Sequence, residues 1–308
     1  MGVASFANMG GPAGDVLATA VFAAFSALPE EDFLAWGWRV PFLLSVVLLG
    51  VGLFVRMKVT KSPLFEKARQ AAAQKNTGGP SEAPLLTVLR RYPRNIALAA
   101  LGGCGALVLQ SLLATFLLSY ALQIGYGRST VLTAQTISSA LHIVTIPAFA
   151  ALSDRIGRKP VMICGALASA LAAFPLFWLV NSGSATLLTF AYILGNPVLQ
   201  ASMYGPTAAF ISEMFGTRAR YTGASLGYQL ASTLGAGLAP LIATSLLMAA
   251  GGGRNTGSVS LFIAVVCLLS AAAIALTHET HRADIGVPGA APATGRTSAD
   301  TVPSGPVS

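Results

Sequence analysis

The stretch VMICGALASALAAFPLFWLV, residues 161–180, decides the fold class because it contains twenty residues and no charge. A helix that rises 1.5 Å per residue needs about 20 apolar residues to cross roughly 30 Å of hydrocarbon. The whole chain has this character, since 54% of its 308 residues are hydrophobic and only 10% are charged, against ~25% charged residues in soluble domains. The sequence therefore predicts an all-α polytopic membrane protein.

Eight apolar runs of this kind can be placed along the chain, and we expect each to form a membrane-spanning helix. Barrel strands would alternate in shorter segments, whereas these runs are continuous. Their approximate bounds are 3–27, 38–56, 95–122, 130–152, 160–181, 186–212, 221–249 and 259–277. Changes in composition divide the chain into two helices of one half-bundle, a basic cytoplasmic linker, a six-helix half-bundle and a disordered cytoplasmic tail, at 1–56, 57–93, 94–281 and 282–308.

The net charge of +8 is distributed in a way that predicts an orientation in the membrane. Sixteen of the nineteen Lys and Arg residues fall in alternate loops on one side, nine of them within 56–94. The other side holds Arg39, Arg128 and Arg254. Cationic loops remain in the cytoplasm, so we expect a multi-pass protein of the plasma membrane with both termini inside. The pattern indicates a lipid bilayer, and not nucleic acid, as the partner of the charges.

The eight runs differ in how they distribute polar side chains. Three of them (38–56, 160–181 and 259–277) are almost wholly apolar and can face lipid, while the others carry polar residues at helical spacing. Polar side chains at bilayer depth are costly unless they face other helices or a water-filled cavity. The pattern predicts trios of two inner helices and one outer helix. Candidates for a solute cavity, each equally suited to bonding between helices, are Gln110, Gln135, Ser138, Asn196, Gln200, Tyr204 and Gln229.

Two titratable side chains lie at predicted membrane depth, and both are candidates for proton coupling. Asp15 interrupts the apolar stretch ANMGGPAGDVLATAVF at 7–22, and His142 lies in the middle of the run 130–152. An ionisable group inside the bilayer is costly, so it indicates a functional site. The alternatives stay open: Asp15 can be a protonated or paired acid that bridges helices, and His142 can be a neutral imidazole bonded within the bundle.

Several stretches resemble a known family of carriers. ALSDRIGRKP at 151–160 is similar to the D-R-x-G-R-[KR] signature of the major facilitator superfamily, at the place of its second copy, between helices eight and nine of twelve. GWRVPFLLS at 37–45 and the block 204–247 resemble the metabolite:proton symporter family, which includes carriers for shikimate, α-ketoglutarate, citrate and compatible solutes. Gly216 stands where that family usually shows Pro. The resemblance implies helices 5–12 of twelve, without the first four.

The signature also implies a cytoplasmic gate. The Asp154 carboxylate can cap the N-terminus of a neighbouring helix, expected to be the first span at residues 2–6, and can pair with nearby guanidinium groups. Gly157 permits a tight turn. A second cluster is expected after the run 186–212, although these cations can equally serve only to orient the loops. The gate candidates are Asp154, Arg155, Gly157, Arg158, Lys159, Glu213, Arg218 and Arg220.

The function implied by the resemblance is secondary active transport of a small organic carboxylate or zwitterion, coupled to protons by alternating access. The sequence contains no G-x-S-x-G, H-E-x-x-H or Walker loop, so we expect no enzyme, no catalytic residue, no metal and no cofactor. The alternative is a truncated carrier that cannot transport, or a membrane interaction or sensor protein. A second chain that supplies the missing helices would be a further partner.

Overall fold

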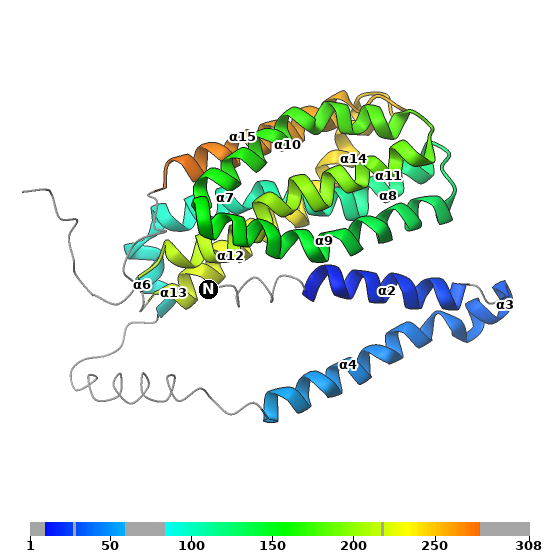
Figure 1. Cartoon of the computed structure of the whole chain (residues 1–308), viewed down its shortest axis with the longest axis horizontal. Helices are drawn as coiled ribbons and strands as arrows, with labels where there is room; N and C mark the ends of the chain where they lie inside the picture. The colour runs from blue at the N-terminus through cyan, green and yellow to red at the C-terminus, as the bar shows by residue number, and fades with distance from the viewer. Residues whose placement is uncertain (1–9, 27–28, 59–83, 217–218, 278–308) are drawn as a thin grey trace, which may run out of the picture.

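The computed structural model describes residues 10–26, 29–58, 84–216 and 219–277, and every element in these ranges is helical (Figure 1). Two expected segments, most of the linker and the tail, lie outside the described residues. The elements are α2 (Gly10–Ser26), α3 (Glu30–Asp32), η1 (Phe33–Gly37), α4 (Arg39–Lys58), α6 (Pro84–Arg91), α7 (Pro93–Ser111), η2 (Leu112–Phe116), α8 (Leu117–Gln123), α9 (Arg128–Ile156), α10 (Arg158–Asn181), α11 (Ala185–Ile193), η3 (Leu194–Gln200), α12 (Ala201–Glu213), α13 (Arg220–Ser232), η4 (Thr233–Gly237), α14 (Ala239–Ala249) and α15 (Gly257–Ala275).

The expected all-α membrane bundle is confirmed. Within the described ranges, six continuous helices are long and apolar enough to cross a membrane: Phe33–Phe54, Pro93–Gln123, Arg128–Ile156, Arg158–Asn181, Arg220–Ala249 and Gly257–Ala275. The remaining two expected spans are helical as well. The described part of the first is α2, which is 17 residues long, and the other is the series α11–η3–α12. That series is less apolar because polar side chains lie in its middle.

The helices from α7 to α15 pack into one bundle, and α2 and α4 lie at its side (Figure 1). Helix α10 packs along α15, α7 lies between α15 and α13, and α9 packs against α11 and α12. Helix α2 runs along α9, whereas α4 diverges from it. Only 6% of the most apolar stretch of the Phe33–Phe54 helix is buried. The other two spans expected to lie outside, α10 and α15, instead contribute to the apolar core of the described bundle, so their position as outer helices is not what the structure shows.

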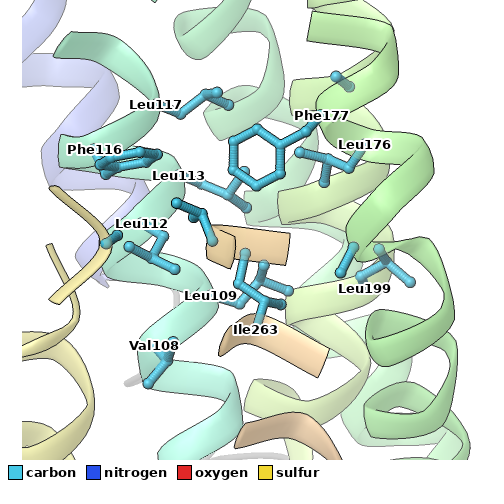
Figure 2. Packing of buried hydrophobic residues seen from close by; sticks show 14 of the residues in the cluster. Val108, Leu109, Leu112, Leu113, Phe116, Leu117, Leu176, Phe177, Leu199 and Ile263 are labelled. Carbon is cyan, nitrogen blue, oxygen red and sulfur yellow. The ribbon is translucent and has the colours of Figure 1, made fainter. Parts of the chain in front are cut away.

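The core of the bundle is apolar and lies between α7–α8, α10 and α15 (Figure 2). The rings of Phe116 and Tyr120 stack at 5.8 Å, and Phe177 from α10 meets both rings edge-on. The Tyr120 hydroxyl donates to Asn181 Oδ1 at 2.5 Å, and the Asn181 amide donates to the carbonyl of Arg254 at 3.2 Å. These bonds join α8, α10 and the loop before α15 at one end.

The segment η3 is a π-helical interruption of an otherwise α-helical span, and it contains Pro197. Proline has no backbone N–H, so the carbonyl of Ile193, four residues earlier, loses its usual donor. A wider turn passes that carbonyl to a later N–H, which is how π-bulges resolve such a conflict inside a helix. The seven residues Leu194–Gln200 adopt this wider turn. The turn lies at mid-span, where the expected polar stripe is also located.

Candidate functional site

Polar side chains from two neighbouring helices meet inside the bundle, where α9 packs on α11 and η3. Helix α9 contributes Gln135, Ser138 and His142, which recur at steps of three and four residues and so lie on one helical face. Asn196 and Gln200 come from η3. Ser138, Gln200 and His142 are 0%, 0% and 3% exposed. Four of the seven cavity candidates, Gln135, Ser138, Asn196 and Gln200, are thus placed with His142 in one mid-span region, which we call the polar cluster.

The polar cluster also includes Tyr192 of α11, which the sequence did not single out. The Ser138 hydroxyl donates to the backbone carbonyl of Tyr192 at 2.8 Å, linking the two helices. Tyr192 precedes Asn196 by four residues, just as Asn196 precedes Gln200. This spacing could have revealed Tyr192 as part of the same polar stripe. A single tyrosine in a long apolar run is more often part of the core, so composition alone gives no reason to select it.

Most members of the polar cluster have buried polar atoms that find no hydrogen-bond partner among the described residues. These atoms are Gln135 Oε1, His142 Nε2, Tyr192 OH, Asn196 Oδ1 and both amide atoms of Gln200. The imidazole of His142 lies beside the Gln200 side chain, yet the geometry is not that of a normal hydrogen bond. Buried polar groups are nearly always partnered in proteins. A group of them at mid-span can therefore hold a small polar molecule, water or a proton.

A shallow open hollow of about 600 Å³ lies between the first turns of α9 and α11. The surface of its wall is mostly apolar, and its lining residues are Ser129, Thr130, Thr133, Thr186, Thr189, Ala185, Phe190 and Ile193. The hollow and the polar cluster belong to the same pair of helices. Both regions offer neutral hydrogen-bonding groups, and within them His142 is the one side chain that can become a cation.

The remaining cavity candidates lie on α7, α12 and α13. Gln110 is half-buried on α7, Tyr204 is half-buried on α12 beside Tyr228, and Gln229 is exposed on α13. The polar stripe of α13 thus does not point into the described part of the bundle. For the proton candidate Asp15, the structure describes the backbone within α2, and its side chain lies outside the described residues.

Glycine lets α9 and α12 approach closely, about one helical turn after the polar cluster along both spans. A Cβ atom added at Gly205 would lie 2.7 Å from the Ile146 carbonyl oxygen and 3.2 Å from the Ala150 backbone nitrogen. Both atoms belong to the backbone of α9, so a side chain has no room there. Gly205 therefore sets the spacing between α9 and α12, the helix that continues from η3.

The signature at 151–160 forms a second group of functional candidates, at the C-terminal end of α9. Arg158 is buried and pairs with two carboxylates: its Nη1 lies 2.9 Å from Asp154 Oδ1, and its Nε donates to Glu213 Oε1 at 2.7 Å. The pair with Glu213 links the first residue of α10 to the last residue of α12. We call Asp154, Arg158 and Glu213 the charged cluster. The sequence predicted one charged group at 154–159 and another at 213–220. Arg158 joins the two groups, because it pairs with both Asp154 and Glu213.

The neighbours of the charged cluster have distinct positions. Gly157 connects α9 to α10 with φ 105° and ψ 152°, a conformation that other residues rarely adopt. The Lys159 ammonium donates to the carbonyls of Ala275 and Thr277, where α15 ends. Arg155 is exposed, and Arg220 begins α13 with a buried Nε that has no partner in the described residues. Arg218 and the helix end that Asp154 was expected to cap, at residues 2–6, lie outside the described residues.

Comparisons with known proteins agree with this architecture. The chain is 36% identical over 258 residues to the shikimate transporter of Escherichia coli K12, covering 82% of this chain and 57% of the relative. It is 35% identical over 284 residues to the inner membrane metabolite transport protein YhjE of the same organism, covering 90% and 62%. A proline/betaine transporter of Salmonella typhimurium LT2 is 29% identical over 255 residues, covering 79% and 49%.

The chain thus spans about three fifths of the length of the first two relatives. No solved structure matches it significantly. The relatives are named as transporters and not as enzymes, in agreement with the expectation from sequence. The resemblance to the metabolite:proton symporter family is also confirmed. The family model of the Major Facilitator Superfamily matches residues 2–224 and 99–300, and the chain therefore belongs to the Major Facilitator Superfamily.

Proposed function

We propose that the chain acts in secondary active transport of a small organic carboxylate or zwitterion across the cytoplasmic membrane, by alternating access. The observation that carries the proposal is the polar cluster, because it buries unpartnered polar atoms at the middle of a membrane bundle. Hydrogen-bond donors and acceptors of this kind suit a polar solute. The names of the relatives, which include shikimate and proline/betaine transporters, support the same class of solute.

Uptake into liposomes that contain the purified full chain tests this proposal. We expect at least one of shikimate, proline and glycine betaine to accumulate above the level of empty liposomes. Gln200→Leu, which removes two buried polar atoms, should lower uptake at least tenfold. Gln123→Leu is the matched control, since Gln123 is exposed at the end of α8, and it should retain uptake. Equal uptake by both variants would remove the polar cluster from the solute path.

Coupling to protons is the second part of the proposal, with His142 as the group that binds the proton. Its imidazole is buried beside Gln200, so a change of charge there would alter the hydrogen bonds offered to a solute. His142→Gln keeps a hydrogen-bonding side chain but cannot titrate. We expect this variant to exchange solute while losing accumulation driven by a pH gradient. Accumulation that persists would exclude His142, and the same assay on Asp15→Asn tests the other candidate.

The charged cluster is proposed to serve the cytoplasmic gate. Arg158 ties the α9–α10 turn to the end of α12, and this leaves Asp154 34% exposed at the surface of a rigid corner. An exposed carboxylate held in this way can cap the N-terminus of a helix from the other half-bundle. Asp154→Asn should increase the labelling of cysteines placed on the cytoplasmic side of the path. Unchanged labelling would leave Asp154 with a structural role alone.

A second candidate function is that of a membrane interaction protein. The observation in its favour is α4, a span that makes almost no buried contact within the described chain. In this case the folded chain alone would take up none of the solutes, and a second chain would be needed to complete the transport path. The uptake assay separates the two functions, provided that thermal unfolding shows the reconstituted chain to be folded.

A further inference from the structure

A basic patch lies where α6 meets α7, at the end of the cation-rich stretch 56–94. It consists of Arg90 and Arg91 in the last turn of α6 and Arg94 in the first turn of α7. All three side chains are exposed, and none forms an ion pair within the described ranges. Figure 1 shows α6 at the end of the bundle where α12 ends and α13 begins.

The junction that carries the basic patch is fixed to the bundle. Val88 of α6 is 2% exposed and packs with Ile96 and Phe215. The Tyr92 ring meets Phe215 edge-on at 6.1 Å, and the Asn95 amide donates to the Met214 carbonyl at 2.7 Å. The arginines therefore project from a rigid surface, and binding a ligand would cost less side-chain and backbone entropy than it would on a loose linker.

Helix electrostatics account for only part of this arrangement. Arg90 and Arg91 stabilise the C-terminal end of α6, where the helix dipole favours cations. Arg94 has the opposite position, because the N-terminus of α7 carries the positive end of a 19-residue helix. Arg94 thus adds a third exposed cation next to a helix N-terminus, and a bound anion would stabilise this arrangement. Guanidinium and free backbone N–H groups are the donors that bind phosphate esters.

The surroundings of the patch indicate a lipid as the source of the phosphate. Helix α7 begins a membrane-spanning helix, so its first turn lies at the level of lipid headgroups. Leu89, next to the arginines, is 47% exposed. Helix α13 packs against α6, and its Tyr221 is 87% exposed. Exposed leucine and tyrosine beside cations are typical of surfaces that lie in the membrane interface.

We propose that Arg90, Arg91 and Arg94 form a binding site for the phosphodiester headgroup of an anionic phospholipid, such as phosphatidylglycerol. The site is independent of the proposed transport, since it needs neither the polar cluster nor the charged cluster. An arginine near an anionic lipid surface strengthens binding about fivefold, so the three together contribute roughly 100-fold.

Native mass spectrometry of the full chain tests the site, using mixed micelles of phosphatidylglycerol and phosphatidylcholine with identical acyl chains. The wild type should bind phosphatidylglycerol preferentially. The triple variant Arg90→Gln, Arg91→Gln, Arg94→Gln should lose this preference by about 100-fold. The matched control Arg128→Gln, Arg254→Gln removes exposed cations from the opposite end of the bundle and should keep it. If the triple variant unfolds, Arg90→Gln and Arg94→Gln alone should each lower the preference about fivefold.

Two outcomes would overturn the inference. One is an equal preference for phosphatidylglycerol in the wild type and in folded variants of the patch. The other is displacement of phosphatidylglycerol by millimolar inorganic phosphate, which would show that the arginines recognise a free anion and not a lipid. Retained binding of phosphatidylglycerol in the presence of inorganic phosphate, with its loss in the patch variants, supports the lipid site.

Discussion

Replacing Gly205 with alanine should force α12 away from α9 and disturb the polar cluster above it. The added Cβ would lie 2.7 Å from the Ile146 carbonyl oxygen, whereas carbon and carbonyl oxygen normally approach to about 3.3 Å. The two backbones must therefore separate by roughly 0.6 Å. Overpacking of this kind costs about 1–3 kcal/mol, and the better helix propensity of alanine returns up to about 1 kcal/mol.

The expected net loss is about 1–2 kcal/mol in the free energy of unfolding. It can be measured as a lower thermal midpoint of the purified chain in detergent, by a few degrees. Gly237→Ala is the matched control, because Gly237 is also helical and its added Cβ would approach Ser232 O no closer than 3.9 Å. If Gly205→Ala were as stable as Gly237→Ala, the close approach of α9 and α12 would not constrain the bundle.

Three further substitutions test the signature region. Arg158→Gln leaves Asp154 and Glu213 without their shared cation and should lower the free energy of unfolding, measured by heat or denaturant, by about 3 kcal/mol. Adding Asp154→Asn and Glu213→Gln should restore part of this stability. If the added substitutions restored none, the pairing would be refuted. Gly157→Ala places a side chain at φ 105° and should cost about 1–3 kcal/mol by the same measurement, so an unaltered midpoint would contradict the turn geometry. Lys159→Gln should cost less than about 1 kcal/mol but should speed amide hydrogen exchange at the end of α15, and exchange at the wild-type rate would argue against its role there.

Hydropathy predicted the long helices within a few residues, because the length of an apolar run is fixed by the membrane it must cross. The predicted runs 160–181 and 221–249, for example, correspond to helices Arg158–Asn181 and Arg220–Ala249. Helix α6 was not predicted and lies within the expected linker. It is only eight residues long, and Val88 is buried against both the nearby Ile96 and Phe215, which lies more than one hundred positions away.

The candidate site was predicted in part. The polar stripe of α9 and the residues Asn196 and Gln200 could be predicted because spacing along a helix determines its faces. Which face a helix turns toward its neighbours is set by packing, so the exposure of Gln229 could not be predicted. The pairing of Arg158 with Glu213 joins residues 55 positions apart, and that contact follows from the tertiary fold alone.

The wide turn of η3 has a consequence for every residue that follows it in the same span. Each residue added to a helix advances the rotation of later side chains by about 100°, and a π-bulge behaves as one inserted residue. Gly205, which follows η3 in the same span, faces α9 in this register. Deleting a single residue from Leu194–Gln200 would rotate all later side chains of the span by about 100° and turn Gly205 away from α9, so the bulge determines which face of α12 meets α9.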